Sequence, residues 1–137
     1  MADEEVGTTM LHHAGLPVAD LERAVEWYTA VLGLVHTTIA RVPEGVEIAF
    51  VVDASGAGVE LFALDAPEPP AWDGPIPALR AGTGHVAFVV GDLDLAVARA
   101  VAAGGRTVWE PRPSPKPGQR IAFVTDPDGN LVELMSG

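Results

Sequence analysis

The chain has no cysteine among its 137 residues. Disulfide bridges and thiolate metal sites are therefore excluded, and any bound metal must be held by nitrogen and oxygen donors. Basic residues are also scarce, because 8 lysines and arginines stand against 19 aspartates and glutamates and leave a net charge of −11. This charge argues against nucleic acid and anionic membrane surfaces as partners.

Long apolar runs are absent as well. No stretch approaches the roughly 18 residues that a membrane-spanning helix needs. The acidic start, Met1-Ala-Asp-Glu-Glu5, is the opposite of the basic start of a signal peptide. We therefore expect a cytoplasmic protein without membrane association. A length of 137 residues suits a single domain with its own hydrophobic core.

The most informative feature that is present is an internal repeat. Its matched segments, first copy and then second, are His13–Leu21 and His85–Leu93, Ile48–Asp53 and Ile121–Asp126, and Val59–Leu61 and Val132–Leu134. Each copy therefore carries one histidine and one glutamate at matched places. This arrangement indicates a site shared between the two copies.

Both copies predict the same order of elements, βαβββ. In the first copy we expect strands over 11–18, 35–42, 45–53 and 59–64, and a helix over 21–32 between the Asp20 cap and Gly33. In the second copy we expect strands over 84–90, 106–111, 120–126 and 131–135, and a helix over 93–103 capped by Asp92. The predicted fold class is α+β, with two tandem βαβββ modules that form a cupped mixed sheet.

The whole chain, 1–137, is predicted to be one domain of two modules. Module one covers about 10–65, a proline-rich linker covers about 66–82, and module two covers about 83–136. We expect the linker to be a solvent-exposed connection. As an alternative, Trp72 and Trp109 would form the wall of an apolar pocket.

Alternation along the strands decides which side chains share a face of the sheet. His13, Glu60, His85 and Glu133 all alternate with apolar residues that suit packing beneath the helices. The four polar residues should therefore lie on the face without helices. His12 is one residue out of register, and its side chain is expected to point to the other face.

Histidine nitrogen and carboxylate oxygen are ordinary ligands of a divalent cation. Two histidines and two glutamates would leave one or two positions of an octahedral ion open to substrate. Each of the four residues alone is more often structural, as a hydrogen-bonded histidine or a solvated glutamate. Together they favour a metal site, because two glutamates among apolar neighbours would be costly to bury unpaired. The predicted cofactor is a divalent metal ion: Zn, Ni, Co, Mn or Fe.

At this point the sequence resembles a known family. The most specific motifs are His13…Val18-Ala-Asp20-Leu21, Trp27-Tyr28, Val59-Glu60-Leu61, Gly84-His85-Val-Ala-Phe88 and Ile121-Ala-Phe-Val-Thr-Asp-Pro-Asp-Gly129…Glu133-Leu134. They resemble the βαβββ module of the vicinal oxygen chelate superfamily, which includes glyoxalase I, methylmalonyl-CoA epimerase, extradiol dioxygenases and bleomycin-resistance-type binding proteins. The resemblance implies a metal held by His13, Glu60, His85 and Glu133, a small-molecule substrate and a homodimer.

The function predicted first is that of a metal-dependent lyase or isomerase of the glyoxalase type. In this chemistry a base removes a proton next to a metal-bound carbonyl, and an enediolate forms. The resemblance implies that Glu133 or Glu60 is the base. Glu47 is a third candidate, since it occupies roughly the place of the base in the epimerases. An ion pair between Glu47 and Arg120 is the structural alternative.

Two other functions stay open. In an Fe(II) extradiol dioxygenase, His13, His85 and Glu133 would form the triad of ligands, but Glu60 would then crowd a position that oxygen or catechol needs. A non-catalytic protein that binds an antibiotic or another small molecule is the other alternative. The intact ligand set argues against it, because such members of the superfamily often lack these residues.

Overall fold

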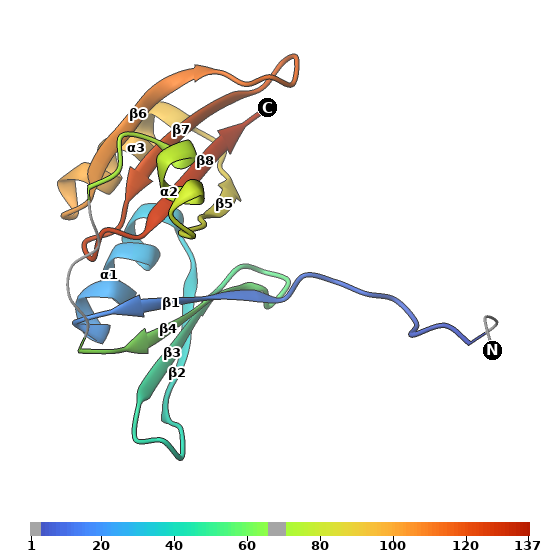
Figure 1. The fold of residues 1–137 in the computed structure, drawn as a ribbon, viewed down its shortest axis with the longest axis vertical. Coiled ribbons are helices and arrows are strands. Elements are labelled where there is room, and N and C mark those ends of the chain that lie inside the picture. Colours follow the sequence, from blue (N-terminus) through green and yellow to red (C-terminus); the bar gives the residue numbers. More distant parts are fainter. Residues whose placement is uncertain (1–3, 66–70) are drawn as a thin grey trace.

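The computed structural model describes residues 4–65 and 71–137. Its elements are β1 (His13–Val18), α1 (Leu21–Leu32), β2 (Val35–Arg41), β3 (Glu47–Val52), β4 (Gly58–Ala63), α2 (Pro75–Arg80), β5 (Val86–Val89), α3 (Leu93–Ala102), β6 (Arg106–Pro113), β7 (Arg120–Thr125) and β8 (Leu131–Ser136). Figure 1 shows the two modules as separate parts of the ribbon. The predicted βαβββ order is confirmed in both modules.

Each module forms its own four-stranded mixed sheet. The strand order is β1-β4-β3-β2 in the first sheet and β5-β8-β7-β6 in the second. The first strand of each module pairs in parallel with the last, while the remaining pairs are antiparallel. The chain therefore places each histidine, the first residue of β1 or the residue just before β5, at a strand directly beside the glutamate-bearing strand.

The two main helices begin where the sequence predicts. The Asp20 carboxylate accepts a hydrogen bond from the backbone N–H of Arg23, and the Asp92 carboxylate accepts one from the backbone N–H of Leu95. These caps satisfy N–H groups that the first turn of a helix leaves without partners. Gly33 ends α1 with a φ of 66°, in the left-handed region that favours glycine.

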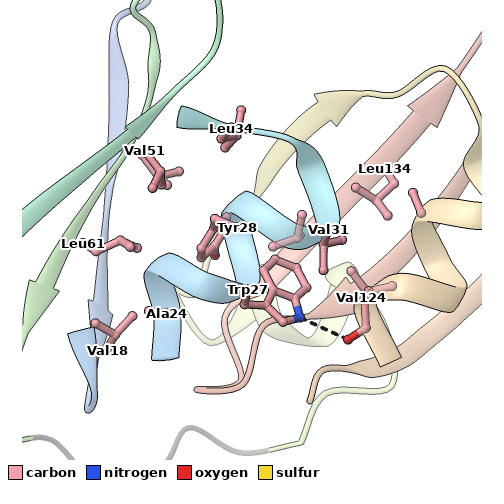
Figure 2. Packing of buried hydrophobic residues seen from close by; sticks show 14 of the residues in the cluster. Val18, Ala24, Trp27, Tyr28, Val31, Leu34, Val51, Leu61, Val124 and Leu134 are labelled. Carbon is pink, nitrogen blue, oxygen red and sulfur yellow. Dashed lines mark hydrogen bonds between the residues drawn. The ribbon is translucent and has the colours of Figure 1, made fainter. Parts of the chain in front are cut away.

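One hydrophobic core joins the modules. The helices α1 and α3 pack against each other and against their own sheets. The core includes Val59 and Leu61 of the first sheet and Val132 and Leu134 of the second, together with Trp27. The Trp27 indole N–H donates to the carbonyl of Ala100 over 3.0 Å, as Figure 2 shows. Since both sheets turn their helix-bearing faces to this core, their other faces point away from it.

The turn over residues 126–130 links the two modules. The Asp128 carboxylate accepts from the backbone N–H of Ala19 over 2.8 Å and from the Arg23 guanidinium over 3.1 Å. The Asn130 side-chain amide donates to the carbonyl of Pro17 over 2.9 Å. A turn is expected here between the predicted strands 120–126 and 131–135. The contacts of this turn with the C-terminal end of β1 are an additional finding.

The segment between the modules differs from the expected open connection. It contains the short helix α2, which starts with Pro75 at its first position, where a proline costs no hydrogen bond. The indole N–H of Trp109 donates to the carbonyl of Asp73 over 3.0 Å and holds this segment against β6. The prolines at 67, 69 and 70 lie outside the described residues.

Residues 4–12 have no regular secondary structure and extend away from the first sheet (Figure 1). In the part of the chain that the structure describes, no helix is long and apolar enough to cross a membrane.

Candidate metal centre

The first candidate pair lies on β1 and β4. Because these strands are parallel neighbours, with His13 opposite Gly58, the His13 ring reaches the Glu60 carboxylate. The distance from His13 Nε2 to Glu60 Oε1 is 3.3 Å. The Glu60 side chain is only 16% exposed, so its carboxylate is largely withdrawn from water. Its negative charge must therefore be stabilised by nearby positive or hydrogen-donating groups.

The second pair repeats this arrangement immediately before β5 and on β8. His85 Nε2 lies 3.2 Å from Glu133 Oε1, and the Glu133 side chain is 19% exposed. The same two atoms therefore face each other in both modules. The predicted alternation is also confirmed, because the apolar neighbours Leu61 and Leu134 of the two glutamates are buried in the core on the opposite face.

A phenylalanine contacts each histidine ring from the far side of the glutamate-bearing strand, from β3 in the first sheet and from β7 in the second. Phe50 meets the His13 ring edge to face at 5.3 Å between centroids, and Phe123 meets the His85 ring in the same way at 5.0 Å. In the antiparallel register, Phe50 lies opposite Glu60 and Phe123 opposite Glu133. We did not single out these residues in the sequence, although the repeat of Ile-Ala-Phe-Val contains both.

The geometry of each pair suits two neighbouring ligands of one ion. Zn–N distances of about 2.0–2.1 Å and Zn–O distances of about 2.0–2.2 Å put adjacent ligand atoms roughly 3 Å apart. The observed separations of 3.3 and 3.2 Å agree with that value.

The two pairs do not meet within one chain. Among residues 4–65 and 71–137, no group of three or more histidine, aspartate or glutamate side chains is placed to hold a metal ion. The physical reason is the shared core, from which the polar faces of both sheets point away. Each chain thus has two separate pairs, His13 with Glu60 and His85 with Glu133, and each pair is called a half-site.

His12 lies closer to the first pair than the sequence suggests. Its Nδ1 is 2.8 Å from Nδ1 of His13. The expectation that its side chain points to the other face is wrong, because β1 begins only at His13 and the alternation of a strand does not extend to the residue before it.

Glu47 is separate from both pairs. It is two and four residues from the buried Ala49 and Val51 and therefore shares their face of the sheet, which is opposite to the face of Glu60. Its carboxylate pairs with Arg41 over 3.2 Å, while Arg120 pairs with Asp94 over 3.1 Å. The predicted Glu47–Arg120 ion pair is therefore wrong, since the nearer partner of each residue is on its own module.

Aromatic residues extend the second half-site along its sheet. The Trp109 ring meets Phe123 edge to face at 5.1 Å, and the Arg112 guanidinium lies 3.2 Å from the centre of the Trp109 ring. Trp72 contributes its backbone carbonyl, which accepts from Arg106. The suggestion that both tryptophans wall an apolar pocket stays a prediction.

A cavity of about 530 Å³ lies beside His85. It is lined by residues 14–19 around β1 and by 82–86 at the start of β5, together with Leu64, Asp128 and Asn130. Space for a small molecule is therefore available between β1 and the segment that leads into β5.

A second polar cluster is buried in the interior. The Tyr28 hydroxyl donates to Asp126 Oδ2 over 2.8 Å, and Asn130 donates to the same carboxylate through its backbone and side chain. Burial raises the pKa of Asp126, although the hydrogen bonds from Asn130 and Tyr28 oppose the shift. Burial, with the Asp126 charge, also raises the pKa of Tyr28 well above its ordinary value. Tyr28 and Trp27 are core residues.

Comparison with known proteins identifies the family. The family model described as the glyoxalase, bleomycin resistance protein and dioxygenase superfamily matches residues 10–134. A probable lactoylglutathione lyase of Vibrio cholerae is 32% identical over 90% of this chain and 87% of its own length. A lactoylglutathione lyase of Neisseria meningitidis is 34% identical over 91% of this chain and 88% of its own length.

A solved structure supports the same assignment at the level of the fold. A glyoxalase family protein from Bacillus cereus is 24% identical and superimposes with a TM-score of 0.75, over 99% of this chain and 97% of its own. The resemblance noted in the sequence is thereby confirmed. The chain belongs to the glyoxalase, bleomycin resistance protein and dioxygenase superfamily.

Proposed function

We propose that this protein is a divalent-metal-dependent lyase or isomerase of the glyoxalase type. The observation that carries the proposal is the matched geometry of the two histidine–glutamate pairs, which present the same atoms at 3.3 and 3.2 Å. The names of the relatives from Vibrio cholerae and Neisseria meningitidis point to the same activity. The substrate would be a small 2-oxo compound joined to a thiol, such as the hemithioacetal of methylglyoxal.

We propose further that two copies of the chain complete each metal site. His13 and Glu60 of one copy would hold the ion together with His85 and Glu133 of the other. The support is that one chain keeps its pairs on outward faces of two sheets, whereas the four donors together match the number and type of ligands that a divalent ion needs. A homodimer would then carry two identical sites.

The role of the chain in catalysis follows from the two carboxylates. A divalent ion supplies, when bound, a positive charge that polarises a neighbouring carbonyl. Glu60 or Glu133 would accept the proton from the carbon beside that carbonyl, and the support is that both side chains face a histidine Nε2 and are largely shielded from water. Phe50 and Phe123 would hold the histidine rings in position through their edge-to-face contacts.

The test combines metal analysis with an activity assay. Elemental analysis of the purified protein identifies the resident metal, and isomerisation of methylglyoxal–thiol adducts is then followed before chelation, after chelation and after addition of each candidate metal. We expect activity to disappear on chelation and to return with at least one metal. Activity that survives chelation unchanged, or its absence with every hemithioacetal and 2-acyl thioester tried, would contradict the proposal.

A further inference from the structure

His12 is held beside His13 by its backbone as well as by its ring. The carbonyl of His12, the residue before β1, accepts a hydrogen bond from the backbone N–H of Gly58 over 3.0 Å. The two imidazole rings meet edge to face, with 5.1 Å between centroids and an angle of 83°. The Nδ1 atoms of the two rings are 2.8 Å apart, within hydrogen-bonding distance.

Such a contact allows only one proton between the two nitrogens. A neutral imidazole has one N–H donor and one acceptor nitrogen. His13 Nε2 faces Glu60, so a metal ligand at this position needs an unprotonated Nε2 and carries its proton on Nδ1. The Nδ1–H of His13 then donates to Nδ1 of His12, which accepts. This arrangement fixes both the orientation of the His13 ring and its tautomer.

We propose that His12 is a positioning residue for the metal ligand His13. The inference rests on the proposed metal site, to which it adds a residue outside the four ligands. The second module offers a contrast, because Gly84 precedes His85 in the equivalent place and has no side chain. The two halves of the site are therefore unequal, because the half that contains His13 has a second imidazole beside the ligand and the half that contains His85 has a glycine there.

The test is the metal affinity of the full-length parent, His12→Ala and His12→Asn, measured by competition with a chromophoric chelator at one fixed pH. A group that orients a metal-binding histidine typically contributes about 10- to 100-fold to metal affinity. We expect His12→Ala to lose affinity in that range. His12→Asn should recover part of the loss, because its amide oxygen can accept from His13. His36→Ala removes another exposed histidine, from β2, and should bind metal like the parent.

A second measurement reads the hydrogen bond directly. In the zinc-loaded protein, the Nδ1 proton of His13 should be protected from exchange and give a downfield NMR signal, which His12→Ala should remove. Equal metal affinity in the parent and His12→Ala, or a His13 signal that His12→Ala leaves unchanged, overturns the positioning role alone. A parent that binds no metal overturns both this inference and the proposed function.

Discussion

At the scale of single residues, Glu60 and Glu133 have the same surroundings and are predicted to have different roles. Both face a histidine Nε2, and both lie opposite a phenylalanine. If both carboxylates bind one ion, only one of them can also act as the base in each turnover. Substitution by glutamine separates the two roles, because an amide keeps the volume and an oxygen donor but removes the charge.

We expect Glu60→Gln and Glu133→Gln each to weaken metal binding about tenfold or more, equivalent to about 1.4 kcal/mol. The variant that lacks the base should lose far more turnover than metal affinity. Metal titration and initial rates, measured on the same samples, give the two quantities. Glu44→Gln, at an exposed turn, should match the parent in both.

The Glu47→Gln variant provides the corresponding test for the third candidate base. Because Glu47 lies on the opposite face of the sheet and pairs with Arg41, we expect parent-like turnover and metal affinity. A large loss of turnover with unchanged metal binding would instead identify Glu47 as the base.

Asp126 is predicted to make stability depend on pH. Its pKa in the folded protein is raised above the ordinary 3.8 by burial. The folded chain thus holds this proton at a higher pH than the unfolded chain. The contribution of Asp126 to stability is therefore present below 3.8 and is lost as the pH rises through the raised pKa.

Urea unfolding of the chelated parent and of Asp126→Asn, at several pH values, measures this contribution. The stability of the parent relative to the variant should increase as the pH falls towards 3.8. Asp53→Asn is a control of opposite sign, because hydrogen bonds from Ser55 lower the pKa of Asp53. A constant difference between the parent and Asp126→Asn across this range would contradict the raised pKa.

At the scale of elements, the position of His13 depends on close contact between three strands. Gly58 lies at the start of β4, between His13 of β1 and Val52 of β3. A β-carbon at Gly58 would lie 2.0 Å from the carbonyl oxygen of Val51 and 2.8 Å from Cα of Val52. Both atoms belong to the backbone and cannot rotate away, so the strands themselves must separate.

Gly58→Ala should therefore destabilise the protein by about 3 kcal/mol, in the upper part of the usual range for overpacking. It should also weaken metal binding, because the strand that carries His13 must shift. Gly84→Ala is the matched control: a β-carbon there meets nothing within 4 Å, and we expect a change within about 0.5 kcal/mol. Thermal and urea unfolding measure the stability of both variants. Equal stability of Gly58→Ala and Gly84→Ala would contradict the close contact of the strands at Gly58.

At the scale of the whole molecule, a site shared between two copies makes a specific prediction for mixtures. In a His13→Ala dimer, both sites lack one ligand, and the same holds for a His85→Ala dimer. A mixed dimer instead has one site without both histidines and one site with all four ligands. Purified mixed dimers should therefore have about half of the parent's activity, because one of their two sites is intact.

The measurement uses the two variants with different tags, coexpressed and purified through both tags in turn. Restored activity and one metal per mixed dimer support sharing between the first module of one copy and the second module of the other. No recovery in mixed dimers would contradict the shared site. A mixture of His13→Ala with Glu60→Gln is the control, because both changes affect the same module and no intact site can form.

The sequence by itself determined the order of the strands, the helices α1 and α3, and the face on which the four site residues lie. The repeat is visible in the chain, and the caps at Asp20 and Asp92 act within a few residues. Alternation places Glu60 and Glu133 opposite the buried leucines, because the side-chain direction in a strand depends only on local geometry. These features do not depend on how the helices and sheets pack against one another.

Only the tertiary structure decided how these pieces meet. The separation of the two half-sites follows from the packing of α1 against α3, and the turn at 126–130 finds its partners Pro17 and Ala19 in the other module. The contact of His12 with His13 depends on the residue at which β1 begins. Contacts between segments so far apart arise from the shape and burial of whole modules, and no local pattern of residues encodes them.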